Sequence, residues 1–138
     1  MKRILFTLAA LFFILTGKAQ TIDTTKNNAK QEDKVFVSVE KAPEFPGGME
    51  QFWSFLAKTM RYPAKAREQN IQGIVILQMV VEKDGSLSNI QVVRGVSEDL
   101  DREAIRLMKL SPKWMPGMQN GQAVRTQYTV PIGFALAN

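Results

Sequence analysis

Three carboxylates close together in the second half of the chain are the first residues to consider for chemistry. Asp99, Asp101 and Glu103 have the side chains that bind cations or carry acid–base catalysis. They follow Ser97, however, and they open a run whose apolar residues recur at helical spacing. Serine is a favoured helix N-cap, and acidic side chains in a first turn complement the helix dipole. This cluster therefore favours the start of a helix over a catalytic or metal site.

The residue inventory excludes most other active-site chemistry. The 138 residues include no cysteine and no histidine, which excludes thiol nucleophiles, Ser-His-Asp catalysis and zinc sites held by these side chains. Asp84-Gly85-Ser86 is too short for a calcium loop, and Gly47-Gly48 lacks the fuller pattern and lysine of a phosphate loop. We therefore expect a protein that is not an enzyme and that has no catalytic residue, metal or cofactor.

The N-terminus has the pattern of a secretory signal peptide. Lys2 and Arg3 precede an apolar run from Ile4 to Leu15, and small residues follow up to Ala19. We expect cleavage after Ala19 and a periplasmic protein, because 12 apolar residues span only about 18 Å of a hydrocarbon core about 30 Å thick. The alternative is an uncleaved segment that anchors the chain in the inner membrane.

The basic charge of the chain lies largely in that segment. The full chain has a formal net charge of +5, from 18 basic and 13 acidic residues. Residues 1–19 hold three of the basic residues and none of the acidic ones, so a mature chain would carry 15 against 13, a net charge of +2. No basic cluster interleaved with aromatic residues remains, and we expect no nucleic-acid partner.

Composition and periodicity divide the mature chain into three parts. Residues 20–34 contain one large apolar residue and are predicted to be a flexible leader. Residues 35–62 are expected to form an N-terminal extension with a short strand over 35–39 and an amphipathic helix over 49–60. Residues 63–138 are expected to form the main domain, with helices over 64–69 and from Ser97 to the proline at 112, and strands over 74–82, 87–94 and 124–134.

This order of elements predicts an α+β fold with helices packed on one face of a small sheet. Asp84-Gly85 between two β-rich runs indicates a hairpin, so the first two strands of the domain are antiparallel. The helix that follows returns the chain, and the last strand then pairs antiparallel with the first. The prediction is a three-stranded antiparallel sheet in the order 2-1-3.

Pro131 interrupts the last predicted strand and points to an edge position. Proline cannot donate a ladder hydrogen bond and is confined to edges, strand starts or bulges. An open edge can accept a strand from a partner. The residues leave two interpretations open: an edge that binds a partner strand, or a proline that only protects the edge from aggregation.

Several short motifs follow one another in a set order between residues 60 and 134. They are Tyr62-Pro63-Ala64, Gly73, Val80-Val81, Asp84-Gly85, Leu100-Asp101, Trp114, Gly121 and Val130-Pro131. In this order and spacing, over about 75 residues, they resemble the TonB C-terminal domain. Residues 39–60 are similar to an extension found ahead of this domain in TonB-like proteins.

The resemblance implies a periplasmic domain that binds the short TonB box near the N-terminus of TonB-dependent outer-membrane transporters. The box adds as a strand beside the last strand of the domain, and the segment around Tyr-Pro also approaches the transporter. In this sequence the implied partner-binding residues are Arg125, Thr126, Gln127, Tyr128, Thr129, Val130, Pro131 and Ile132 on the strand, with Thr59, Met60, Arg61 and Tyr62 before the second helix.

The sequence departs from a full energy transducer in its N-terminal part. The leader of 15 residues has no proline and reaches at most about 50 Å. The anchor histidine of the family is also missing. We therefore expect either a TonB-like protein that binds transporters and supports energy-coupled transport, or an envelope interaction module without a role in uptake. Pairing of two copies edge to edge as a homodimer is a further alternative.

Overall fold

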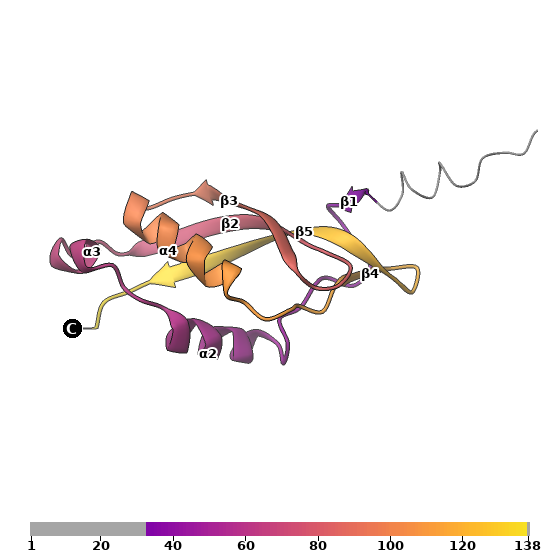
Figure 1. Ribbon diagram of the computed structural model, residues 1–138, viewed down its shortest axis with the longest axis horizontal. Coiled ribbons are helices and arrows are strands. Elements are labelled where there is room, and N and C mark those ends of the chain that lie inside the picture. The colour runs from indigo at the N-terminus through magenta and orange to yellow at the C-terminus, as the bar shows by residue number, and fades with distance from the viewer. Residues whose placement is uncertain (1–32, 138) are drawn as a thin grey trace, which may run out of the picture.

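The fold is organised around strand β2 (Gly73–Val81), which lies between two antiparallel neighbours, as Figure 1 shows. These neighbours are β3 (Leu87–Arg94) and β5 (Gln122–Phe134). The computed structural model describes residues 33–137, so the predicted signal peptide and most of the predicted leader lie outside the described residues. β2 is buried along most of its length, which agrees with the central position expected for an apolar strand.

The prediction of a purely antiparallel sheet of three strands was wrong for the sheet as a whole: β3, β2 and β5 pair antiparallel in this order, but two further strands join them. The sheet has five strands and is mixed. β1 (Val35–Phe36) pairs with β5 in parallel, and β4 (Gly117–Gln119) forms a hairpin with the start of β5. A short strand was predicted over 35–39, and β1 covers its first two residues, but its pairing with β5 was not predicted. β4 was not predicted, because three residues are too few to show a period in the sequence.

The three helices within residues 33–137 begin and end close to the predicted positions. They are α2 (Met49–Thr59), α3 (Ala64–Glu68) and α4 (Glu98–Lys109). The backbone N–H of Leu100 donates to the Ser97 hydroxyl at 3.3 Å, so Ser97 caps α4 as expected. The described part of the chain, residues 33–137, has no helix that is long and apolar enough to span a membrane.

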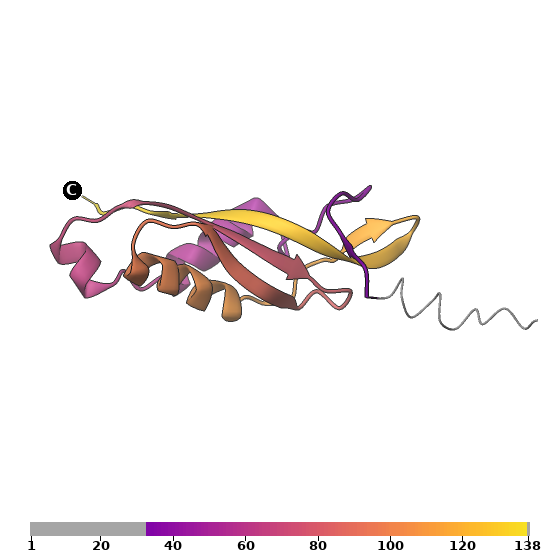
Figure 2. The same ribbon diagram turned by 90° about the horizontal axis from the view of Figure 1, so that it is seen from above.

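The hydrophobic core lies between the sheet and the helices. Figures 1 and 2 show α4 lying across the sheet, whereas α2 runs beside it, next to β5. The inward residues of β2 and β5 pack against α4 and α2, and the largest buried side chains include Phe52, Leu77, Met79, Leu100, Leu107, Met108 and Ile132. One face of the sheet therefore holds the core.

An aromatic cluster joins the N-terminal extension to this core. The ring of Trp114 contacts the rings of Phe45 and Phe52 edge-on, each at 5.7 Å between centroids, and Tyr128 of β5 at 5.4 Å. Trp114 is buried, whereas Trp53 of α2 is 49% exposed. The extension thus packs as part of the domain.

Gly85 in the β2–β3 hairpin sits directly against the loop that carries Trp114. Its φ is +86°, and its carbonyl accepts a hydrogen bond from the Trp114 N–H at 2.8 Å. A Cβ on Gly85 would lie 1.9 Å from the Trp114 carbonyl oxygen. Glycine is therefore required here for two reasons: the left-handed backbone and the close approach of a second chain segment.

We predict that Gly85→Ala lowers the free energy of unfolding by more than about 3 kcal/mol, because a left-handed backbone and an overpacked contact add their costs. Gly121→Ala is the matched control: φ is +74°, but nothing lies within 4 Å of a Cβ there. That variant should lose only about 1 kcal/mol. Urea unfolding of both variants tests this, and equal losses would show that the contact with Trp114 contributes nothing.

Candidate functional site: the open edge of strand β5

β5 turns alternate residues to opposite faces of the sheet. Thr126, Val130 and Ile132 are buried on the core face, and Tyr128 is half-buried there. Arg125, Gln127, Thr129 and Pro131 occupy the other face, with Thr129 and Pro131 exposed. This is the division that the alternation of the sequence predicted.

One edge of β5 is paired along only part of its length. β2 pairs with β5 from Thr126 to Phe134, whereas β1 pairs with Arg125 and Thr126. Within residues 33–137, the stretch from Gln127 to Phe134 has no strand on its second side. The predicted edge is therefore open from Gln127 onward. At Arg125 and Thr126, which the resemblance also implied as partner-binding residues, this edge is covered, because β1 of the same chain pairs with them.

The position of Pro131 determines which backbone groups face the open side. Pro131 lies opposite Ile76 in an unbroken antiparallel register. Because proline has no N–H to exchange, this pair fits a non-hydrogen-bonded position of the ladder. The same alternation places Thr129, opposite Gln78, at an equivalent position two residues away. The N–H and C=O of Thr129 therefore point away from β2, toward the open edge.

An ion pair fixes the start of the edge. The guanidinium of Arg125 donates to both carboxylate oxygens of Glu82, at 2.7 and 3.1 Å, and a third contact runs to the backbone carbonyl of Asp33 at 2.6 Å. The hydrogen bond from Arg125 lowers the pKa of Glu82, and the Ser88 hydroxyl also donates to this carboxylate. Sequence reasoning missed Glu82, since nothing local marks a carboxylate after a strand as a partner for a residue 43 positions away.

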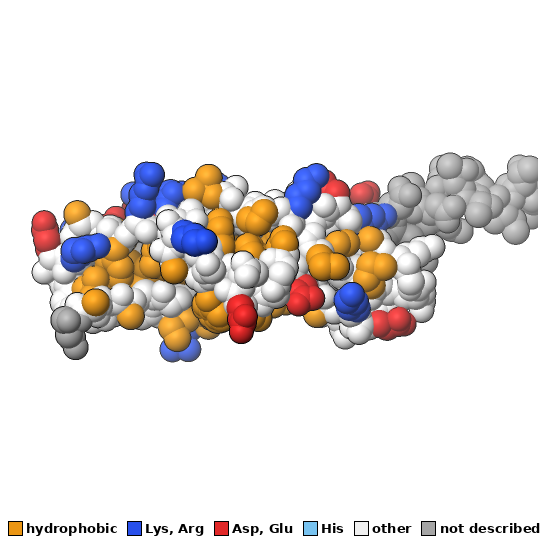
Figure 3. Space-filling view, turned by 90° about the horizontal axis from the view of Figure 1, so that it is seen from below, with side chains coloured by type: hydrophobic (Ala, Val, Ile, Leu, Met, Phe, Trp, Pro, Cys, Tyr) orange, Lys and Arg blue, Asp and Glu red, His pale blue; other side chains and the backbone are white. Residues whose placement is uncertain are grey.

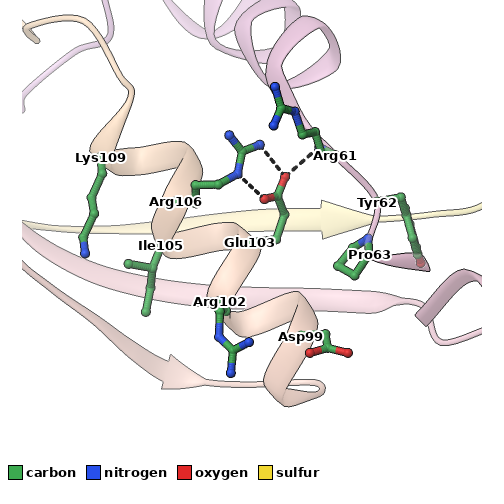
Figure 4. Close-up of a pocket in the computed structure, with 9 residues that line it drawn as sticks. All are labelled: Arg61, Tyr62, Pro63, Asp99, Arg102, Glu103, Ile105, Arg106 and Lys109. Carbon is green, nitrogen blue, oxygen red and sulfur yellow. Dashed lines mark hydrogen bonds and ion pairs between the residues drawn. The ribbon is translucent and has the colours of Figure 1, made fainter. Parts of the chain in front are cut away.

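The second predicted part of the site is the connector, residues 59–62, between α2 and α3. A buried carboxylate on α4 holds its backbone: the Arg61 N–H donates to Glu103 Oε2 at 2.6 Å (Figure 4). Arg106 donates to both oxygens of Glu103 and also to the Thr59 carbonyl at 3.0 Å. Glu103 and Arg106 thus tie the connector to α4, a role that the sequence analysis did not predict for either residue.

The connector and α4 form the rim of a shallow cavity of about 690 Å³. Figure 4 shows the side chains of Arg102, Ile105 and Lys109 along one side of α4, while Arg106 turns toward Glu103 and the connector. The lining residues are Arg61, Tyr62, Pro63, Asp99, Arg102, Glu103, Ile105, Arg106 and Lys109. Its charges are mixed, and Arg102 and Arg106 are each paired with a glutamate of the same helix.

The connector contacts β5 at Phe134, two residues beyond the strand residues predicted for the site. The Tyr62 ring packs edge-on against Phe134 at 6.0 Å, and its hydroxyl donates to the Ile71 carbonyl. Thr59 and Arg61 instead contact α4 through their backbones. Tyr62 is thus the predicted connector residue that contacts a side chain of β5, and it does so where the open edge ends.

Titration of Glu103 should make the stability of the domain depend on pH. Burial alone would raise the pKa of Glu103, but hydrogen bonds from Arg106 and the Arg61 amide, with the charges of both residues, bring it below its ordinary value of 4.5. Because the folded pKa lies below the unfolded one, the stabilisation is present above about pH 4.5 and is lost as the pH falls through the folded pKa.

We predict that Glu103→Gln costs about 2 kcal/mol of unfolding free energy at pH 7 and less at pH 3, which lies below the ordinary pKa of 4.5, so that part of the stabilisation by the charge is already lost. Urea unfolding of both proteins at the two pH values measures this. Glu98→Gln, which removes an exposed ion pair on the same helix, is the control and should change stability by less than about 0.5 kcal/mol. A loss for Glu103→Gln that is equal at both pH values would contradict the assigned role of the charge.

Comparison with known proteins shows which family the chain belongs to. The family model for the Gram-negative bacterial TonB protein C-terminal matches residues 58–136, more than half of the chain. The chain is 35% identical over 79 residues to the "Protein TonB" of two Xanthomonas campestris pv. campestris strains, B100 and ATCC 33913. These matches cover 55% of this chain and 34% of each relative, so the chain matches about a third of the relatives' length.

Two of the solved structures that the chain is similar to are also TonB C-terminal domains. The solution structure of the Pseudomonas aeruginosa TonB C-terminal domain is 29% identical, with a TM-score of 0.48, and the match covers 57% of this chain and 80% of that one. A Helicobacter pylori TonB C-terminal domain is 22% identical, with a TM-score of 0.47, over 62% of this chain and 90% of that one. On the family match, which spans the connector, the central strand and the open edge, the chain belongs to the TonB C-terminal domain family.

Proposed function

We propose that this chain binds a short extended segment of a TonB-dependent outer-membrane transporter, the TonB box, as a strand beside β5. The observation that carries the proposal is the unpaired side of β5 from Gln127 to Phe134, in a chain that belongs to the TonB C-terminal domain family. Backbone groups on an open edge bind an extended peptide through main-chain hydrogen bonds, and neighbouring side chains select its sequence.

The surroundings of this edge suit a segment with apolar and polar residues in alternation. On the core face, an added strand would lie beside the half-buried Tyr128, and on the other face beside Gln127 and Thr129. α2 runs beside β5, on the side away from β2 (Figure 1). The face that carries α2 shows hydrophobic side chains between scattered charges (Figure 3), and Met49 and Trp53 of α2 are both about half exposed.

The connector supplies a second contact in this proposal. Glu103 and Arg106 hold its backbone, while the Arg61 side chain remains exposed at the cavity rim. Tyr62 packs at the end of β5, so a transporter segment that leaves the edge there would pass close to the connector. This arrangement supports the participation of residues 59–62 together with the strand.

The wider role that we propose is support of energy-coupled transport from the periplasm. It draws on the family and on the relatives named TonB, of which the matched region is about a third. Secretion through residues 1–19 and cleavage after Ala19 are parts of this proposal that come from the sequence pattern, as is a division at residue 63 between an extension and a main domain that pack together.

We predict that Thr129→Pro weakens binding of a TonB-box peptide about tenfold while the fold is retained. The substitution removes an N–H that points toward the partner and not toward β2. Loss of one such hydrogen bond weakens binding by about 1 kcal/mol, and the proline ring also keeps the partner strand from close contact, which weakens binding further. Peptides copied from transporter N-termini of the same organism, with scrambled versions as negative controls, are titrated against both proteins by fluorescence anisotropy.

Thr129→Val is the matched control, because it keeps the N–H and a β-branched side chain and should bind within about twofold of wild type. Circular dichroism and urea unfolding report whether Thr129→Pro is folded. An unfolded Thr129→Pro would mean that the N–H pairs with β2. Wild-type protein that binds TonB-box peptides no better than scrambled ones would overturn the proposed function and leave an envelope interaction module as the better hypothesis.

A further inference from the structure

The N-terminal extension occupies the beginning of the same edge that would receive the partner strand. Thr126 pairs with Val81 of β2 and also with Phe36 of β1. Since a strand has only two sides, β1 lies on the side of β5 away from β2. That is the side that is open from Gln127 onward.

Side-chain contacts hold β1 in this place. Arg125, which pairs with Val35 in the ladder, also donates to the carbonyl of Asp33 at 2.6 Å. Its guanidinium is oriented by the two contacts with Glu82 of the β2 end. The start of β1 is therefore fixed to the β2–β5 pair through an ion pair whose side chains are only about a quarter exposed.

The chain that leaves β1 is anchored again on the neighbouring hairpin. After Phe36 the backbone bends, and Lys41 exchanges two backbone hydrogen bonds with Met118 of β4, at 3.1 and 2.9 Å. The backbone N–H of Glu40 donates to the Gln119 side chain at 3.0 Å. Figures 1 and 2 show β1 and β4 at the same end of β5, with the connecting chain crossing β5 between them. We name residues 35–41 the strap.

We infer that the strap is a stop that sets the length and register of the partner strand. It confines the added strand to the eight residues from Gln127 to Phe134, because residues 125 and 126 are already paired on that side. This inference rests on the proposed function. It adds that the site takes a short extended segment, and that partner residues beyond the strap form no ladder hydrogen bonds with β5.

The kind of partner follows from this geometry. Eight strand residues span about 26 Å, and a partner segment of that length fills the edge completely. Val37, which is 77% exposed, follows directly after β1 at the closed end of the edge. It offers an apolar contact to the end residue of the added strand that lies next to the strap. A transporter segment of eight extended residues, with an apolar residue at the end that meets the strap, fits this site best.

The test compares peptide length in the full chain with and without β1 pairing. Val35→Pro with Phe36→Pro removes both N–H groups of β1 and disfavours its pairing. Ser38→Pro with Val39→Pro places two prolines in the bend between β1 and Lys41, outside the ladder, and serves as the matched control, because it leaves Val37 in place. Each protein is titrated with an eight-residue TonB-box peptide and with versions lengthened by two residues at either end.

For wild type and the bend control, we expect the three peptides to bind within about twofold of each other. For the β1 variant, we expect one of the lengthened peptides to bind about fivefold more tightly than the eight-residue peptide, which corresponds to about one added ladder hydrogen bond. In the wild-type protein, amide hydrogen exchange measured by NMR should become slower within residues 127–134 when peptide binds, whereas the exchange rates of Val35 and Phe36 should not change.

Two results would overturn the inference while leaving the proposed function intact. One is faster exchange at Val35 and Phe36 when wild-type protein binds peptide, since the partner would then displace the strap. The other is an equal gain from peptide length in wild type and β1 variant. Failure of every peptide to bind wild type would instead contradict the proposed function itself.

Discussion

The register between β2 and β5 is the constraint on which the rest of the structure depends. It runs without a break from Gly73 opposite Phe134 to Val81 opposite Thr126. A slip of one residue would turn Val130 and Ile132 to solvent and Pro131 into the core, so burial of the apolar set specifies this register. The same register determines which backbone groups of β5 face the open edge. The packing of the core and the geometry of the candidate site are thus set by one ladder.

Two partly buried ion pairs attach the irregular segments to this ladder. Glu82 with Arg125 fixes the first strand, and Glu103 with Arg106 fixes the connector. In both pairs the pKa of the carboxylate is lowered, so each is ionised at neutral pH. Ion pairs of this kind add little net stability, because desolvation offsets attraction, but removing one partner is costly. Their contribution here is to hold particular backbone segments next to the proposed binding edge.

The N-terminal extension belongs structurally to the domain, although the family match begins at residue 58. Phe45 and Phe52 surround Trp114, and the strap pairs with β5 and β4. The extension therefore shapes the site in two ways: it contributes α2 beside the edge, and it closes one end of that edge. A domain cut at residue 63 would lose both.

Local patterns in the sequence determined most of the secondary structure and the faces of the strands. Alternation along β5, the helical spacing of α2 and α4, the Ser97 cap and the Asp84-Gly85 hairpin all depend on neighbours within a few residues. Pro131 indicated an edge because its missing N–H is a property of the residue itself. These features could be predicted, and the structure agrees with them.

Tertiary structure alone decided what pairs with what across long separations. β1 meets β5 some 90 residues later in the chain, and Glu82 finds Arg125 across 43 positions. The alternation over 35–39 does not show which strand β1 will pair with, and a segment as short as β4 carries no period of its own. Nothing in the sequence near Glu103 and Arg106 marks the backbone of Arg61 and Thr59 as their partner. Such contacts form only when distant parts of the chain fold together, so local sequence patterns do not reveal them. The sequence therefore indicated that the last strand is an edge, and the tertiary structure determined how much of that edge is open.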